Sequence, residues 1–219
     1  MDMITVLFLL GGKGSRFGDT LPKQFHPLGD KKVYQHALST FEQHPSIDEI
    51  LLIVPPEGDI PLPESHRKIV GGATRQESVY RGLCACSSNT THVMVHDGVR
   101  PFVSPRIIDA HIRALQQSQA INTCIPSKDT LNQIAADEIL AIPDRTLYMR
   151  GQTPQTFAYP LLLQAHETTA KTNATDDCQL VLDLPHPVSY ILGEDANFKI
   201  TTALDLAIAK NFYYTRQQQ

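Results

Sequence analysis

A segment near the N-terminus combines glycines with three cationic side chains. The segment GGKGSRFGDTLPKQF, residues 11–25, follows the apolar run MITVLFLL and contains Lys13, Arg16 and Lys23. Glycines allow backbone N–H groups to approach an anion, and cations neutralise its charge. Three cations within eleven residues exceed what one monophosphate requires. We therefore predict that this segment binds a nucleoside triphosphate, with a glycine-rich turn carrying solvated cations as the structural alternative.

The segment matches neither of the two common phosphate-binding motifs. A P-loop requires lysine and a hydroxyl residue directly after its second glycine, whereas here Lys13 precedes Gly14. A dinucleotide-binding loop requires a third glycine where Phe17 stands, and Pro22 opposes an early helix. We expect a long loop that wraps the phosphates, in which Lys13 contacts a β- or γ-phosphate or is solvated.

A second candidate site is the segment HDGVRPF, residues 96–102. Asp97 ends an apolar run, HVMVHD, and the carboxyl end of a parallel strand is where ligands bind in α/β sheets. A carboxylate there suits Mg²⁺ that is also held by phosphates. The alternative is that Asp97 caps the next helix or pairs with Arg100. We predict a supporting hydrogen-bonding role for His96.

Short apolar runs alternate with amphipathic segments along the chain. This alternation predicts an α/β fold with a doubly wound, mostly parallel sheet and ligands at the carboxyl ends of its strands. The expected strands are residues 4–10, 49–55, 67–71, 92–97, 120–126 and 188–193, and the expected helices are residues 33–41, 74–83, 105–115, 160–170, 175–184 and 203–212.

The pattern changes between residues 127 and 148. This segment, SKDTLNQIAADEILAIPDRTLY, has two weakly strand-like pieces and few large apolar residues. It predicts a projecting hairpin arm that either folds back or packs against another chain. We expect one domain over residues 1–219, with this arm inside it.

Composition excludes several classes of partner. The net charge of -4 opposes general binding to nucleic acids or anionic membranes, and the apolar N-terminal run is too short to span a membrane. Without a basic leader, the default location is the cytoplasm. The four cysteines form no CxxC pair, which favours reduced thiols over disulfides or a zinc site.

Several motifs together carry a family resemblance over essentially the whole chain. In order, LLGGKGSR, LPKQF, GGATRQESV, HDGVRP, RGQTPQTF, TDD and NFKITTALDL resemble the motifs of the 2-C-methyl-D-erythritol 4-phosphate cytidylyltransferases, which activate a polyol phosphate. The resemblance implies a Rossmann-like nucleotidyltransferase fold. It also implies attack of a substrate phosphate oxygen on the α-phosphorus of CTP, with Mg²⁺ as cofactor and pyrophosphate as leaving group.

The resemblance also implies roles for individual residues at the nucleotide. Arg16 and Lys23 match a pair that stabilises charge at the α-phosphate, and Lys199 matches a third cation at the same centre. The residues that match the nucleotide pocket are Leu10, Gly11, Gly12, Gly14, Gly72 and Ser78.

A further group matches the polyol phosphate site. Arg100, Thr153, Thr175 and Lys199 match positions around that substrate, and Asp97 is expected to bind a polyol hydroxyl or the metal. In the family the arm reaches the neighbouring subunit's site, so Thr130 and Arg145 are expected there and the protein is expected to be a homodimer. Without the resemblance, Thr130 and Arg145 would be interpreted as ordinary exposed polar residues of a hairpin.

Two rival functions remain. Ribitol-5-phosphate cytidylyltransferases share stretches like GSR, LPKQF and VRPF, whereas TRQESV and TDD favour the methylerythritol enzymes. A nucleotide-binding protein without catalysis is the other rival. Retention of Arg16, Lys23, Asp97 and Lys199 together opposes it.

Overall fold

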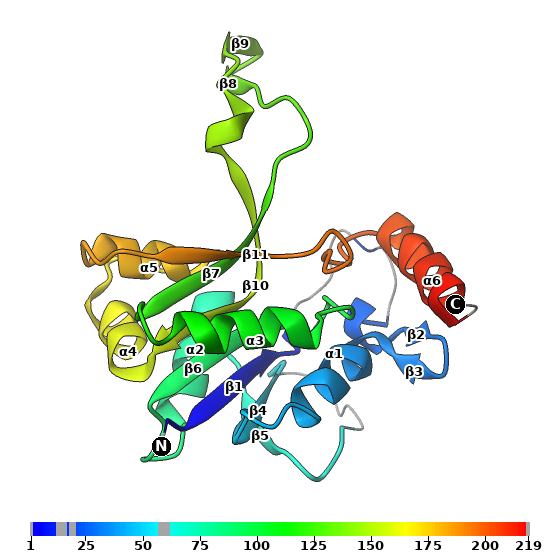
Figure 1. Cartoon of the computed structure of the whole chain (residues 1–219), viewed down its shortest axis with the longest axis vertical. Coiled ribbons are helices and arrows are strands. Elements are labelled where there is room, and N and C mark those ends of the chain that lie inside the picture. Colours follow the sequence, from blue (N-terminus) through cyan, green and yellow to red (C-terminus); the bar gives the residue numbers. More distant parts are fainter. Residues whose placement is uncertain (1, 12–16, 18–20, 57–61, 218–219) are drawn as a thin grey trace.

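The fold is built on a twisted sheet with helices on both faces (Figure 1). The computed structural model describes residues 2–11, 17, 21–56 and 62–217. Within these residues, seven strands pair in the order β11-β7-β10-β6-β1-β4-β5, and every pair is parallel except those of β10 with β6 and β7. The strands are β1 (Ile4–Leu9), β4 (Glu49–Val54), β5 (Arg67–Val70), β6 (His92–Asp97), β7 (Ala120–Pro126), β10 (Met149–Ala158) and β11 (Ser189–Leu192). The predicted doubly wound, mostly parallel α/β fold is confirmed.

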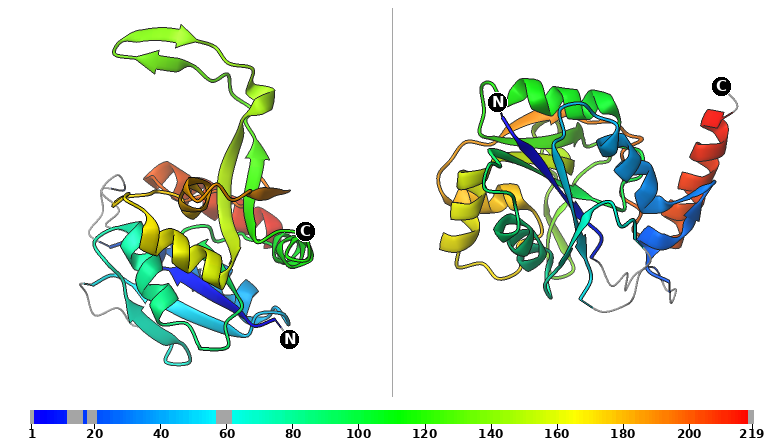
Figure 2. Two further views of the ribbon diagram at one scale, coloured as in Figure 1. Left: turned by 90° about the vertical axis from the view of Figure 1, so that its left-hand side faces the viewer. Right: turned by 90° about the horizontal axis from the view of Figure 1, so that it is seen from below.

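Helices cover the sheet in two layers (Figures 1 and 2). Helices α1 (Val33–Glu42) and α3 (Pro105–Ala114) pack on one face, and α2 (Arg75–Cys84), α4 (Tyr159–Thr168) and α5 (Asp177–Asp183) pack on the other. The C-terminal helix α6 (Ala203–Gln217) packs beside the small ribbon of β2 (Pro27–Leu28) and β3 (Lys31–Lys32).

The continuous apolar character of β1 follows from its central place in the sheet. Val6 and Phe8 pack under α1 and α3, whereas Leu7 and Leu9 pack under α2 and α4. Side chains alternate between faces along a strand, so a strand covered on both faces is apolar at almost every position; the polar residue of β1, Thr5, is buried and hydrogen-bonded to Thr90. This strand carries its apolar run directly into the glycine-rich segment at residue 11.

The strand β10 was not predicted from the sequence. Its residues, MRGQTPQTFA, lack an apolar run, yet Gln152, Thr153, Gln155 and Thr156 are all buried. Gln155 donates from Nε2 to Asn122 Oδ1 and Asp176 Oδ2, at 3.0 and 2.8 Å. Hydrogen bonds to other segments compensate for burying polar groups, and a search for apolar periodicity does not find such a strand.

The predicted arm is present as a hairpin that projects from the sheet (Figures 1 and 2). It consists of β8 (Gln133–Ala135), β9 (Glu138–Ala141) and the 3₁₀ turn η2 (Arg145–Leu147), carried at the ends of β7 and β10. Its large apolar side chains are exposed within this chain, as expected for a segment without a core of its own: Ile134, Ile139, Leu140, Ile142 and Leu147.

None of the helices in the described ranges has the length and apolar character needed to cross a membrane.

Candidate active site

The candidate site begins where β1 and β6 end side by side. The register pairs Leu9 with Asp97, and Gly98 N–H then donates to the Leu9 carbonyl oxygen over 2.9 Å. A Cβ atom on Gly98 would lie 2.8 Å from Leu10 Cδ2 and 2.9 Å from the Leu9 oxygen. Glycine is therefore required for the chain to turn here, directly after the carboxylate of Asp97.

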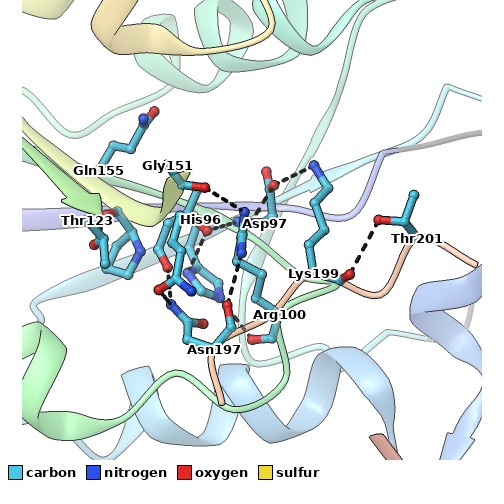
Figure 3. A network of polar contacts seen from close by, with 12 residues as sticks. His96, Asp97, Arg100, Thr123, Gly151, Gln155, Asn197, Lys199 and Thr201 are labelled. Atoms are coloured by element: carbon cyan, nitrogen blue, oxygen red, sulfur yellow. Dashed lines mark hydrogen bonds and ion pairs between the residues drawn. The ribbon is translucent and has the colours of Figure 1, made fainter. Parts of the chain in front are cut away.

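Asp97 is the centre of an ion-pair cluster (Figure 3). Lys199 donates from Nζ to Asp97 Oδ2 over 2.8 Å, and Arg100 Nε lies 4.0 Å from the same oxygen. Arg75 Nε lies 3.6 Å from Oδ1. These cations come from a loop near the C-terminus, the loop after β6 and the first residue of α2. The structure thus brings together Asp97, Arg100 and Lys199, as the sequence predicts.

The cluster keeps Asp97 ionised despite its burial. Burial by itself would raise the pKa of Asp97, but the charges of Lys199, Arg75 and Arg100 outweigh it and hold the pKa well below its ordinary value. Asp97 is therefore a hydrogen-bond acceptor at neutral pH and not a proton donor. In this position it can accept from a substrate hydroxyl.

Arg100 is held as a rigid cation beneath the site. Its Nη1 donates to the Asn197 carbonyl oxygen over 2.9 Å, and its Nη2 donates to that of Gly151 over 3.4 Å. The side chain is buried, and burial lowers its pKa, although the Asp97 charge opposes this effect. Within the described residues its Nε has no hydrogen-bond partner. This nitrogen faces Asp97 Oδ2 and is shielded from solvent, so Arg100 can act on an anionic ligand through its charge.

His96 supports the site from below. Its Nε2 lies 3.3 Å from the Arg100 carbonyl oxygen, so this nitrogen carries the proton, and Thr153 Oγ1 donates to Nδ1 over 3.2 Å. Burial lowers the pKa of His96 to about 3. A neutral histidine whose nitrogens are both hydrogen-bonded is the supporting residue that the sequence indicates, and not a general base.

We expect His96 to make stability depend on pH. Its pKa in the folded protein, about 3, lies below the ordinary 6.5, so the unfolded chain takes up a proton that the folded protein excludes. The stabilisation is complete above pH 6.5 and is lost as the pH falls from 6.5 towards 3, by about 1.4 kcal/mol per pH unit. Urea unfolding at pH 7 and pH 5 measures this slope. His96→Gln is expected to reduce this slope, and a slope equal to that of the wild-type protein would contradict the assignment.

Gly72 and Ser78, which are both predicted to contact the nucleotide, lie together in the structure. Ser78 Oγ accepts from Gly72 N–H over 3.0 Å and donates to the Thr74 carbonyl oxygen over 2.8 Å. A Cβ on Gly11 would lie 4.0 Å from Ser78 Oγ, so the three predicted positions form one surface. The Ser78 hydroxyl proton is already used, so Ser78 has a remaining lone pair and no free proton to offer a nucleotide.

Leu10 is also engaged within the protein. Its N–H donates to the Ile53 carbonyl oxygen over 2.8 Å, and its carbonyl oxygen accepts from Gln24 Nε2 over 2.6 Å. The predicted contact of the Leu10 backbone with the nucleotide stays a prediction: its N–H is used to join β1 to β4, and its carbonyl oxygen retains a second lone pair.

Lys23 begins the 3₁₀ turn η1 (Lys23–Phe25). Its charge helps to lower the pKa of Asp205, against the effect of burial and in addition to backbone N–H groups of Thr201 and Thr202. Lys23 is therefore near the start of α6, where the loop that carries Lys199 ends. The remaining residues predicted for this segment, Gly12, Lys13, Gly14 and Arg16, lie outside the described residues.

The other predicted substrate residues divide into three places. Thr153 is buried, and its hydroxyl accepts from Asp97 N–H over 3.1 Å and donates to His96. Its predicted contact with substrate stays a prediction: the hydroxyl proton is used inside the protein, and one lone pair of the oxygen remains. Thr175 is exposed just before α5. Thr130 and Arg145 are exposed on the arm, where Arg145 Nη1 donates to the Lys128 carbonyl oxygen over 2.9 Å.

The donor set around Asp97 bears on Mg²⁺. No group of three or more His, Cys, Asp or Glu side chains in the described part of the chain could hold a metal by itself. Asp97 Oδ2 is hydrogen-bonded to Lys199, whereas Oδ1 has a cation only at 3.6 Å. Mg²⁺ takes few protein carboxylates and keeps waters and phosphate oxygens. The residues therefore fit a metal held mainly by nucleotide phosphates, with one contact to Asp97 at most.

Sequence reasoning missed Arg75 and Asp177. Both lie within motifs that carry the family resemblance, TRQESV and TDD, but neither motif indicates a role for them. Arg75 contacts Asp97 and Asp177 at once, at 3.6 and 2.6 Å. The motifs themselves contain no signal for this contact, because the residues are 102 positions apart.

Comparisons with known proteins agree with this geometry. The family model described as IspD, 2-C-methyl-D-erythritol 4-phosphate cytidylyltransferase, matches residues 4–216. A protein of that name from Syntrophotalea carbinolica is 38% identical, with 97% of each chain covered. A ribitol-5-phosphate cytidylyltransferase from Lactiplantibacillus plantarum is 33% identical over 94% of this chain and 97% of its own. The crystal structure of 2-C-methyl-D-erythritol 4-phosphate cytidylyltransferase from Thermus thermophilus superposes with a TM-score of 0.81 at 32% identity, covering 98% of this chain and all of that one.

Proposed function

Because this chain belongs to the 2-C-methyl-D-erythritol 4-phosphate cytidylyltransferase family, we propose that it transfers CMP from CTP to 2-C-methyl-D-erythritol 4-phosphate. The observation that carries the proposal is the ion-pair cluster of Asp97 with Lys199 and Arg100, at the strand ends where α/β sheets bind ligands. It combines cations for phosphate with an acceptor for hydroxyl groups, which is what a polyol phosphate requires.

The chemistry is one displacement at phosphorus. An oxygen of the polyol phosphate forms a bond to the α-phosphorus of CTP, and the bond from that phosphorus to the oxygen bridging to the β-phosphate breaks. The electron pair leaves with pyrophosphate. Catalysis then consists of positioning and charge stabilisation. We assign the charge at the α-phosphate to Arg16, Lys23 and Lys199, as the family resemblance implies.

The polyol phosphate is assigned to the other side of the cluster. Arg100 is fixed by the carbonyl oxygens of Asn197 and Gly151, so its position does not depend on substrate. We assign its positive charge to the phosphate of this substrate, and Asp97 accepts from a polyol hydroxyl. The exposed Thr175 is the further contact.

We also propose that Mg²⁺ accompanies CTP. Bound to the triphosphate, it would neutralise phosphate charge, with Asp97 as its candidate protein ligand. We place the reaction in the cytoplasm, since both substrates are charged phosphates that do not cross membranes unaided.

A homodimer through the arm completes the proposal. The arm exposes Ile134, Ile139, Leu140, Ile142 and Leu147 within one chain, and an exposed apolar cluster of this kind marks an interaction surface. In a symmetric dimer each arm would extend to the partner, which would bring Thr130 and Arg145 to the partner's site.

We expect the arm to give intermolecular complementation. Arg145→Ala and Lys23→Ala chains are each expected to be nearly inactive, but a mixed dimer places both substitutions in one site and leaves the other intact. After random subunit exchange, about a quarter of wild-type activity is expected. Subunit mixing followed by a pyrophosphate-release assay measures this. If the mixture is no more active than the average of its components, the sites are not shared.

One assay tests the proposed function directly. The protein is incubated with Mg²⁺, each of the four nucleoside triphosphates, and either 2-C-methyl-D-erythritol 4-phosphate or ribitol 5-phosphate, and pyrophosphate release is followed. We expect release with CTP and the methylerythritol phosphate. Release with ribitol 5-phosphate alone would favour the second candidate, which the 33% identical relative supports. No release with any pair would contradict the enzymatic proposal.

A further inference from the structure

Asp177 lies behind the ion-pair cluster and has no role in the reaction as proposed above. It is the first residue of α5, and its side chain is 1% exposed. Its Oδ2 accepts from Arg75 Nη1 over 2.6 Å, and its Oδ1 lies 3.2 Å from His166 Nε2. A carboxylate only accepts, so His166 donates from Nε2. A buried carboxylate with both oxygens engaged is a fixed point in the structure.

Arg75 connects this fixed point to the candidate site. One edge of its guanidinium contacts Asp177, and its Nε lies 3.6 Å from Asp97 Oδ1. The guanidinium is planar and rigid, so an arginine that is held at one nitrogen presents the others in a defined direction. Asp97 is thereby held at Oδ1 by Arg75 and at Oδ2 by Lys199, which comes from a different segment.

The buried pair is stabilised from its far side as well. His166 has a side chain that is 1% exposed and stacks on Tyr80 of α2, with ring centroids 6.2 Å apart. Burial would raise the pKa of Asp177, but Arg75 and His166 lower it below its ordinary value. The charge of Asp177 is therefore retained at neutral pH, and with it the orientation of Arg75.

We propose that Asp177 is a positioning residue for cytidylyl transfer: through Arg75 it holds the Asp97 carboxylate in the orientation that places Lys199 at the reacting phosphates. The kinetic part of this inference rests on the proposed function. The geometric part, that Asp177 controls the contact between Asp97 and Lys199, does not.

The first test is kinetic. Asp177→Asn keeps the shape of the side chain but places an amide between Arg75 and His166, which removes an acceptor from one of two donors. We expect kcat/KM for the polyol phosphate to fall by about 10- to 100-fold, the cost of a displacement of about 1 Å at a reacting centre. The Kd of CTP is expected to change little. The matched control is Asp183→Asn, which removes an exposed ion pair with Lys171 from the same helix.

A double-mutant cycle separates positioning from loss of stability. If Asp177 acts through Arg75, then Asp177→Asn has no further effect on kcat/KM in a chain that already carries Arg75→Gln. A merely structural role predicts that the two losses multiply. Arg75→Lys is a second variant at a partly exposed position: it keeps the charge but cannot contact both carboxylates, so we expect about a 10-fold loss.

The second test needs no turnover. The ¹⁵N-detected NMR signal of the Lys199 ammonium group reports its contact with Asp97 in the free protein. We expect Asp177→Asn and Arg75→Lys to shift or broaden this signal, and Asp183→Asn to leave it unchanged. An unchanged signal in Arg75→Lys, or full kcat/KM in that variant, overturns the inference, whether or not Asp177→Asn folds. If the wild-type protein has no activity, the proposed function is contradicted. The NMR signal of Lys199 then still decides whether Asp177 controls the contact between Asp97 and Lys199.

Discussion

Replacing Lys23 with alanine is expected to lower the rate of cytidylyl transfer by about 100-fold or more. The turn that carries Lys23 is anchored by the two residues that follow it: Gln24 donates to the Leu10 carbonyl oxygen over 2.6 Å, and Phe25 packs edge-on against Tyr34. Its backbone is therefore fixed before substrate binds. A preorganised cation stabilises developing charge without reorganisation, which is why its loss affects kcat more than KM.

The measurement is steady-state pyrophosphate release with both substrates varied. Lys31→Ala is the matched control, because Lys31 is an exposed lysine whose Nζ donates to Ser39 Oγ, away from the cluster. Lys23→Arg tests charge against geometry, since a planar guanidinium does not replace a point charge. Wild-type kcat in Lys23→Ala would show that this lysine does not act at the α-phosphate.

Replacing Asp97 with asparagine is expected to lower kcat/KM for the polyol phosphate by about 100-fold. The substitution keeps the side-chain volume but removes the charge that Lys199, Arg75 and Arg100 surround in the described structure. Lys199 then loses its partner at 2.8 Å and, at 40% exposure, is free to turn towards solvent. The hydroxyl acceptor is weakened at the same time. We do not expect CTP to bind more weakly, because its Mg²⁺ is held mainly by the nucleotide phosphates and the site becomes more positive.

The exposed Asp109, which pairs with His44, supplies the control Asp109→Asn. Calorimetry measures the equilibrium binding of CTP, and steady-state kinetics measures turnover of the polyol phosphate. Together they separate the effects of Asp97→Asn on the two substrates. A parallel loss of CTP affinity and polyol-phosphate turnover would mean that Asp97 maintains the whole pocket and does not act on the polyol side.

In the candidate active site, sequence motifs predict which residues come together, but not which of their atoms are already hydrogen-bonded. Sequence reasoning correctly joined Asp97, Arg100 and Lys199, and it predicted an arm between residues 127 and 148. It did not indicate that the backbone of Leu10 and the hydroxyl of Thr153 already make hydrogen bonds inside the protein. A motif identifies a position, but the neighbours of its side chain determine which atoms remain available.

The strand β10 and the contact between Arg75 and Asp177 have a common explanation. A pattern of apolar residues identifies segments whose burial is driven by the hydrophobic effect. Most strands and helices of this protein are such segments. Polar side chains of Met149–Ala158, such as Gln155, are instead buried where remote segments accept hydrogen bonds from them, and no local pattern records those partners.

The sequence by itself determined the doubly wound α/β class, the projecting arm and the family, because the spacing of apolar residues and the order of the motifs are both properties of the sequence. Only the tertiary structure decided which atoms meet at the ends of β1 and β6. Arg75, Asp97, Asp177 and Lys199 lie on four separate segments, and the packing of α2 and α5 onto the sheet brings their charges within contact. Electrostatic interactions depend on distance in space and burial, and neither is set by separation in sequence.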